Sequence, residues 1–125
     1  MAEPGTVGSG TVAPRLFLLV YEGSWTVEIT INDNGDTRSI GLVGRLDTLT
    51  SPNLEETLKG SCEQWQNTVV DCKGLDYVSS AGLRVLLSGQ KIASGAEHSL
   101  TLVNVSDDVR EVFDITGFSR ILSIE

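Results

Sequence analysis

The order of strand-like and helix-like patterns along the chain is the feature that most constrains its fold. Apolar residues alternate with polar ones over residues 25–31, which is the period of a strand with one buried face. Residues 32–36 are turn formers that include Asn34 and Gly35, so residues 37–43 are expected to return antiparallel as the second strand of a hairpin. Helices and strands then alternate. We therefore predict an α/β fold whose mixed sheet begins with a β-hairpin and is covered by helices on at least one face.

The first helix is predicted to follow a polar link over residues 44–50. Ser51 is expected to cap it, and Pro52 fits its first position because the N–H that proline lacks would be unpaired there anyway. Glu55 and Glu56 fall in its opening turns, where the positive end of the helix dipole favours acidic groups. Its buried stripe is predicted to consist of Leu54, Leu58, Cys62 and Trp65.

Two further helices alternate with short apolar strands. They are predicted over residues 80–93 and from Ser106, a capping residue, to Gly117, a typical end signal. Strands are expected at residues 68–72, 100–103 and 121–124, with a loop over residues 73–79. Parallel strands joined by helices need right-handed crossovers, so this order implies parallel pairs after the hairpin.

Residues 1–23 precede these patterns and are predicted to be an extension of a single domain that spans residues 24–125. Residues 1–14 are rich in Gly, Ser, Thr and Pro and are predicted to be disordered, since they offer little apolar surface to offset the entropy lost on ordering. Residues 16–21 are uniformly apolar. They allow three interpretations: an extra edge strand, a surface that docks on a partner, or an extension that lies against the core.

Charge and composition exclude several classes of function. The 125 residues include nine Lys and Arg against 17 Asp and Glu, a net charge of -8, so nucleic acid and anionic membrane surfaces are poor partners. The longest apolar run near the start has six residues, whereas a membrane span needs about 20, so no membrane insertion is expected. Cys62, Cys72 and the single histidine, His98, are too few ligands for a zinc site, and the two cysteines fit a reduced, cytoplasmic compartment.

Most enzyme templates fail on inspection. The chain has neither of the glycine-rich phosphate-binding motifs, G-x-G-x-x-G and G-x-x-x-x-G-K-[ST]. Around Ser80, a nucleophile elbow would need glycine where Val78 stands, and His98 is predicted to lie exposed in a loop. We therefore expect neither catalysis nor a cofactor.

The most informative segment is residues 75–87, which leaves a strand and enters a helix through two serines and a glycine. Ser79 and Ser80 stand near unpaired backbone N–H groups and the positive end of the helix dipole, so a serine here can cap the helix, and a phosphate placed on it would be held by the same donors. Gly82 either makes room for another molecule or packs beneath a neighbouring strand. The residues alone leave a structural cap and a phosphorylation site both open.

Three segments together resemble a known family. Gly-Arg-Leu-Asp at residues 44–47, the stretch 76–84, and Val-Phe-Asp-Ile-Thr-Gly-Phe at residues 112–118 are similar in order and spacing to the STAS domain family, in particular to bacterial anti-sigma factor antagonists. The resemblance covers about residues 24–125. It implies that the unphosphorylated protein binds an anti-sigma factor that is also a serine kinase, which frees a sigma factor. It also implies that phosphorylation by that kinase ends the attachment.

The resemblance also assigns roles to single residues. Alignment on Gly82 and Leu83 places the family's phosphorylated serine at Ser80, and Ser79, which occupies the position of a family aspartate, is a competing acceptor. Gly82 is expected close to the surface that the partner approaches, so Gly82→Ala is expected to leave the fold intact. The implied partner surface comprises Asp47, Thr48, Ser79, Ser80, Ala81, Gly82 and Arg84.

Two further expectations follow from the resemblance. A phosphatase that removes the phosphate is an implied second partner, and ATP would be bound by the kinase. The alternative function is a STAS subunit of a phospholipid-type transport system, in which the domain has a structural or regulatory role.

Overall fold

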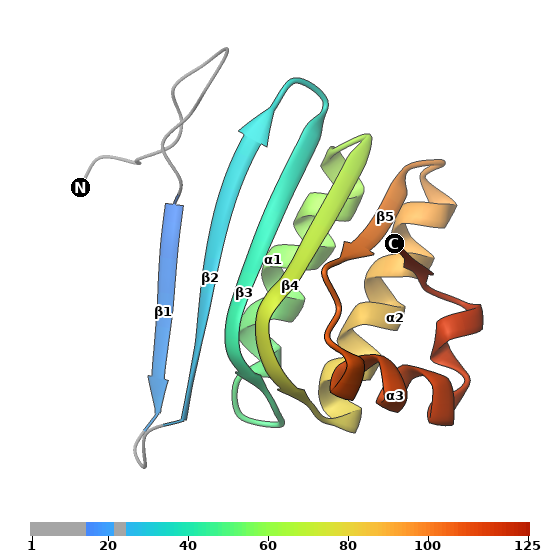
Figure 1. Cartoon of the computed structure of the whole chain (residues 1–125). Coiled ribbons are helices and arrows are strands. Elements are labelled where there is room, and N and C mark those ends of the chain that lie inside the picture. Colours follow the sequence, from blue (N-terminus) through green and yellow to red (C-terminus); the bar gives the residue numbers. More distant parts are fainter. Residues whose placement is uncertain (1–14, 22–24) are drawn as a thin grey trace.

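The computed structural model describes residues 15–21 and 25–125, which form one six-stranded sheet and three α-helices (Figure 1). The strands lie in the sheet in the order of the sequence. The first three are antiparallel, and the third to the sixth are parallel, so the predicted mixed α/β sheet is confirmed. The strands are β1 (Arg15–Tyr21), β2 (Trp25–Asn34), β3 (Thr37–Leu46), β4 (Asn67–Val78), β5 (Ser99–Val103) and β6 (Ser123–Ile124).

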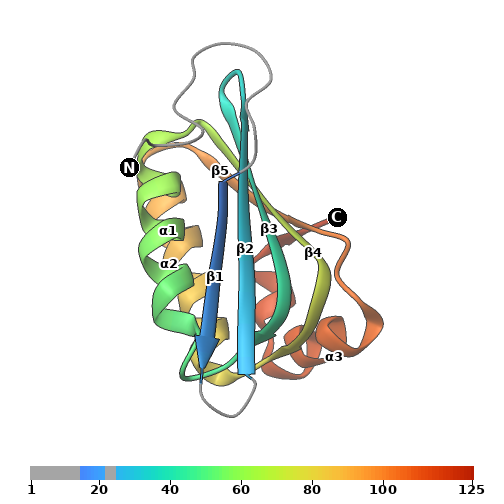
Figure 2. The ribbon, with the colours of Figure 1, turned by 90° about the vertical axis from the view of Figure 1, so that its left-hand side faces the viewer.

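The helices cover both sides of this sheet. α1 (Ser51–Gln64) and α2 (Ser80–Gly95) pack side by side on one face, whereas α3 (Asp107–Thr116) lies on the other (Figure 2). A 3-10 turn over Phe118–Arg120 leads from α3 to β6. Each helix connects two neighbouring parallel strands, as the alternation of patterns predicts. At α3 both end signals are confirmed, because Ser106 Oγ accepts a hydrogen bond from the N–H of Val109 and Gly117 ends the helix with φ +83°.

The β2–β3 hairpin is longer than predicted. Asn34 pairs with Thr37, so the turn is the two residues Gly35-Asp36, and Gly35 adopts φ +63°. Asp33, which reads as a turn former, instead pairs across the hairpin with Arg38, whose Nε and Nη2 donate to its carboxylate at 2.7 and 2.9 Å. This two-point ion pair explains why the strands continue into a polar stretch.

The end of β3 and the second half of β4 differ most from the prediction. The loop predicted over residues 73–79 is strand as far as Val78, and the polar link predicted from Gly44 begins with strand as far as Leu46. The pairing of β3 with β4 shifts register twice, and Gly44 has φ +113° at the second shift. These shifts break the alternation of apolar residues, which is why the sequence pattern does not reveal the strand.

Three smaller expectations are also wrong. Ser51 is the first residue of α1 rather than its cap, which is Thr50, although Glu55 and Glu56 do lie in the opening turns of the helix. Trp65 follows the end of α1 and is half-buried, with the Arg38 guanidinium 5.1 Å from the centre of its ring. The last strand contains only Ser123 and Ile124, since the N–H groups of Ile121 and Leu122 bond back to the carbonyl oxygen of Phe118 in the preceding 3-10 turn.

The structure shows which element residues 16–21 form. Residues 16–21 lie in β1, which pairs antiparallel with β2 at the edge of the sheet, so the edge-strand interpretation is confirmed. The predicted disorder of residues 1–14 lies outside the described residues. No helix in the described part of the chain is long and apolar enough to cross a membrane.

Cys62 and Cys72 are both free and buried in the core. Burial raises the pKa of the Cys62 thiol to about 11 and that of the Cys72 thiol to about 12. Both thiols are therefore protonated near neutral pH and lack the thiolate that reacts with electrophiles or binds metal.

This burial predicts that neither cysteine of the native protein reacts with a thiol-specific disulfide reagent at neutral pH, whereas both react once the chain is unfolded in urea. The rate of colour release with and without urea measures this directly. Stoichiometric reaction of the native protein within seconds would show that one of the thiols is accessible.

Candidate functional site

The ends of β3 and β4 bring two loops together at one end of the sheet. Leu46 and Val78 are the last residues of the two strands and are paired in register. The N–H of Ser79 donates to the carbonyl oxygen of Leu46 at 2.8 Å, which ties the start of α2 to the loop that precedes α1. The predicted site residues from these two segments are therefore neighbours in space.

Asp47 shapes the first of the two loops. Its Oδ1 accepts hydrogen bonds from the N–H groups of Leu49 at 2.9 Å and Thr50 at 3.1 Å. Thr50 is buried, its hydroxyl donates to the carbonyl oxygen of Arg45 at 2.8 Å, and it accepts from the N–H of Asp47 at 2.9 Å. The loop is thus held by its own side chains, with Thr48 and Leu49 exposed at its tip.

The two serines at the start of α2 have different environments. Ser79 is the N-cap, with extended backbone, and its Oγ accepts a hydrogen bond from the N–H of Gly82 at 3.3 Å. Ser80 is the first residue of the helix and is exposed, and its hydroxyl makes no hydrogen bond within the described part of the chain. The cap that the sequence predicts is therefore Ser79 alone, and the hydroxyl of Ser80 faces solvent.

Gly82 is a packing residue. It is buried, and a Cβ atom placed on it would lie 2.8 Å from Cγ of Leu46 and 2.9 Å from Cγ2 of Val78. Both carbons belong to branched side chains of the core, which have little room to move. This packing contradicts the expectation that the fold accepts alanine at Gly82, whereas the place of Gly82 on the partner surface stays a prediction. Its lack of a side chain instead allows α2 to pack close to the ends of β3 and β4.

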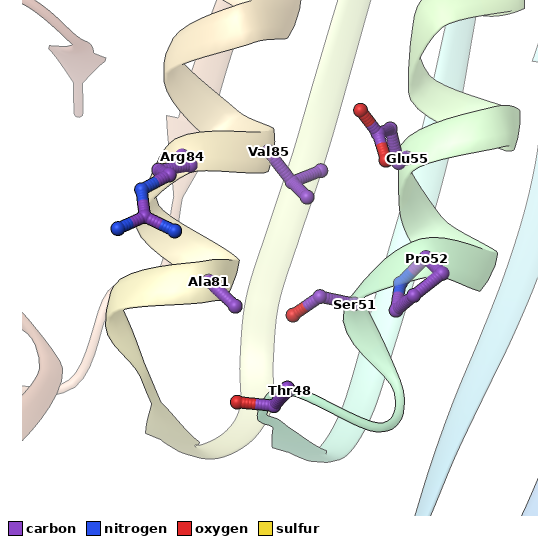
Figure 3. Close-up of a pocket in the computed structure, with 7 residues that line it drawn as sticks. All are labelled: Thr48, Ser51, Pro52, Glu55, Ala81, Arg84 and Val85. Carbon is purple, nitrogen blue, oxygen red and sulfur yellow. The ribbon is translucent and has the colours of Figure 1, made fainter.

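A small cavity lies between the first turns of α1 and α2 (Figure 3). Its volume is about 230 Å³, and Ser51, Ala81 and Val85 point into the gap between the helices. Three of the seven predicted partner residues line it, and the other four, Asp47, Ser79, Ser80 and Gly82, do not. The lining residues are Thr48, Ser51, Pro52, Glu55, Ala81, Arg84 and Val85.

Sequence reasoning missed Ser51, Pro52, Glu55 and Val85 as parts of this surface. The first three were read only as signals of a helix start. The additional fact needed was that α1 and α2 lie side by side, which brings the first turn of one helix against the first turn of the other.

Two further observations concern the metal-ligating residue types and the single histidine. Within the described residues, no group of three or more His, Cys, Asp or Glu side chains could hold a metal ion. His98 is half-buried rather than exposed as predicted, and its Nδ1 lies 2.9 Å from the carbonyl oxygen of Cys62, near the carboxyl end of α1. The histidine thus lies at the end of α1 away from Ser80.

A family model described as "Mlab, STAS domain" matches residues 29–123. BtrV of Bordetella bronchiseptica is 37% identical over 84 residues, which cover 66% of this chain and 72% of BtrV. The anti-sigma-B factor antagonist of Bacillus subtilis is 29% identical over 98 residues, which cover 78% of this chain and 90% of that protein.

The fold is also that of SpoIIAA, an anti-sigma factor antagonist and cell fate determinant of Bacillus. Its unphosphorylated form superposes with a TM-score of 0.67 at 18% identity, covering 78% of this chain and 87% of that chain. Its phosphorylated form gives a TM-score of 0.63 at 17% identity, covering 78% and 90%.

The packing of Gly82 predicts that Gly82→Ala lowers the free energy of unfolding by about 1–3 kcal/mol, because the added methyl group overfills the contact with Leu46 and Val78. Urea denaturation followed by circular dichroism measures this. Gly60→Ala in α1 is the matched control, since nothing lies within 4 Å of a Cβ at Gly60. There alanine should stabilise the protein by up to about 1 kcal/mol. Equal stability of Gly82→Ala and the unmodified protein would contradict the packing role.

Proposed function

The chain belongs to the STAS domain family, and on this premise we propose that it is an anti-sigma factor antagonist that is switched by phosphorylation of Ser80. In its unphosphorylated form it binds an anti-sigma factor that is also a serine kinase, and a sigma factor is released. Phosphorylation by that kinase ends the attachment. The observation that carries the proposal is the exposed hydroxyl of Ser80 at the start of α2, beside the loop that Asp47 shapes.

Phosphorylation would break existing hydrogen bonds at one of the two serines and not at the other. Ser79 Oγ already accepts from the N–H of Gly82, and the residue is half-buried and tied through its own N–H to Leu46. A phosphate on Ser79 would have to displace this cap. Phosphorylation of Ser80 would break no side-chain hydrogen bond within the described residues, and the residue is exposed to solvent. These differences favour Ser80 as the acceptor.

The start of α2 can accommodate the phosphate without a change of fold. A phosphate adds a charge of about -1.5 to -2 near neutral pH, and the unpaired N–H groups and dipole of a helix start favour an anion there. Arg84 is exposed and lies four residues after Ser80, on the same face of the helix one turn later. It offers a cation that can pair with the phosphate.

The same charge acts differently at a binding surface. We propose that the partner covers the tip of the loop at Thr48 and Leu49, the first turn of α2, and the cavity between α1 and α2. A hydrated dianion at Ser80 in the middle of that surface must be desolvated or set against the partner's own groups. Phosphorylation therefore weakens the complex but does not destabilise the isolated domain, as a binding switch requires.

Other proteins carry out the chemistry of the switch: the kinase binds ATP, and a phosphatase removes the phosphate. The protein itself works in the bacterial cytoplasm without catalysis of its own. The alternative, a subunit of a phospholipid-type transport system, shares the fold. The name of the Bacillus subtilis relative, which matches over most of its length, favours the switch. Recovery of a transporter ATPase as the stable partner from native membranes would favour the alternative.

This proposal predicts that the cognate kinase and ATP place a phosphate on Ser80, and that the phosphorylated form binds the kinase roughly a thousandfold more weakly. Fragment mass spectrometry locates the phosphate, and titration calorimetry measures the two affinities. Ser80→Ala should bind constitutively, and Ser80→Asp should bind weakly.

Ser79→Ala is the matched control. It should lose about 1 kcal/mol of stability with its cap but still be phosphorylated on Ser80. Phosphate found only on Ser79 would overturn the assignment, and equal affinity of the phosphorylated and unphosphorylated forms would remove the switch.

A further inference from the structure

β1 lies outside the part of the chain that matches the family model, which begins at residue 29. It forms the outermost strand of the sheet beside β2 (Figures 1 and 2). Its seven residues, Arg-Leu-Phe-Leu-Leu-Val-Tyr, are apolar or aromatic except for Arg15. The proposed switch assigns no role to this strand.

Within the described structure, β1 has an open edge. Its pairing with β2 is continuous over seven residue pairs, from Arg15 opposite Ile31 to Tyr21 opposite Trp25. No other strand of the described structure pairs with its outer side, so alternate N–H and C=O groups along that side have no strand partner. Of the features that usually block such an edge, which are charged side chains, proline, a bulge and a short strand, these seven residues contain only one charged side chain, Arg15 at the first position.

The opposite edge of the sheet is different. β6 contains only two residues, Ser123 and Ile124, which is too short to template a long partner strand. Among the described strands, β1 therefore provides the one long open edge of each molecule. Two molecules that pair through this edge leave no second long edge for a third copy, so the product is a closed dimer and not a fibre.

We infer that β1 pairs antiparallel with β1 of a second copy, about a two-fold axis at Leu18. This register uses all seven residues, with Leu18 opposite itself and Arg15 opposite Tyr21 of the second copy. Identical strands that pair antiparallel form a self-complementary interface, so a second copy fits this edge without any further adaptation.

The charge of the chain favours this edge over other surfaces for self-association. Two molecules that each have a net charge of -8 repel one another, and β1 contains no acidic residue. One strand pair buries less than the roughly 1,200 Å² of a stable interface, so the dimer is weak and its population rises with concentration.

The test is sedimentation velocity of the full chain from micromolar to submillimolar concentration, with Leu18→Lys and Leu18→Glu. The unmodified protein should shift from monomer to dimer. Each variant alone places two like charges opposite each other at the two-fold axis and should dimerise at least about tenfold more weakly. An equimolar mixture of the two variants sets lysine against glutamate and should restore the dimer. Rescue by mixing separates pairing at Leu18 from a general loss of folding.

Ile115→Lys is the matched control, because Ile115 is an exposed apolar residue on α3, and it should leave the dimer intact. Hydrogen exchange of the unmodified chain needs no variant, and protection of β1 amides should rise with concentration. A monomer at every concentration would overturn the inference. A dimer that neither Leu18 variant weakens would also overturn it, as would a mixture of the two variants that stays monomeric. The inference also fails if the β1 amides become protected only when another protein segment is added and not when the concentration of this chain rises.

Discussion

The hydrogen bond from the N–H of Ser79 to the carbonyl oxygen of Leu46, 2.8 Å long, is the contact on which the proposed site depends. It exists because β3 and β4 stay paired to their last residues despite two shifts of register. Gly82 completes the junction, since a side chain there would push α2 away from Leu46. One junction therefore sets the position of the Asp47 loop, the cap of α2 and the exposed hydroxyl of Ser80.

The side chains at this junction are of two kinds: some hold the shape of the surface through hydrogen bonds, and others are exposed on it. Asp47, Thr50 and Ser79 bond to the protein's own backbone and hold the surface in shape. Thr48, Ser80 and Arg84 stand exposed on that surface. A charge added at Ser80 therefore meets a frame that is already hydrogen-bonded. The fold is expected to keep its shape while the surface changes its electrostatic character, so that phosphorylation is read by the partner and not by the core.

Local patterns in the sequence were enough for the order of elements, the hairpin and the caps of α2 and α3, because periodicity and capping depend on residues a few positions apart. They were insufficient wherever the local structure depends on contacts with residues far away in the sequence. The strand after Lys73 needed its partner β3, and the packing of Gly82 needed Leu46, which lies 36 positions earlier. The cavity lining from Ser51 to Glu55 needed the side-by-side placement of α1 and α2. Ser80 was singled out by the resemblance of residues 76–84 to the STAS family, and its role as phosphate acceptor stays a prediction.

The central claim is that phosphorylation changes the surface around Ser80 and leaves the fold as it is. Backbone amide chemical shifts of the unphosphorylated and Ser80-phosphorylated protein, compared residue by residue, test this most directly. We expect changes confined to the first turn of α2, the loop over residues 47–50 and the start of α1, with β2, β5 and α3 unaffected. Changes spread across the sheet, or loss of dispersion throughout the spectrum, would contradict it.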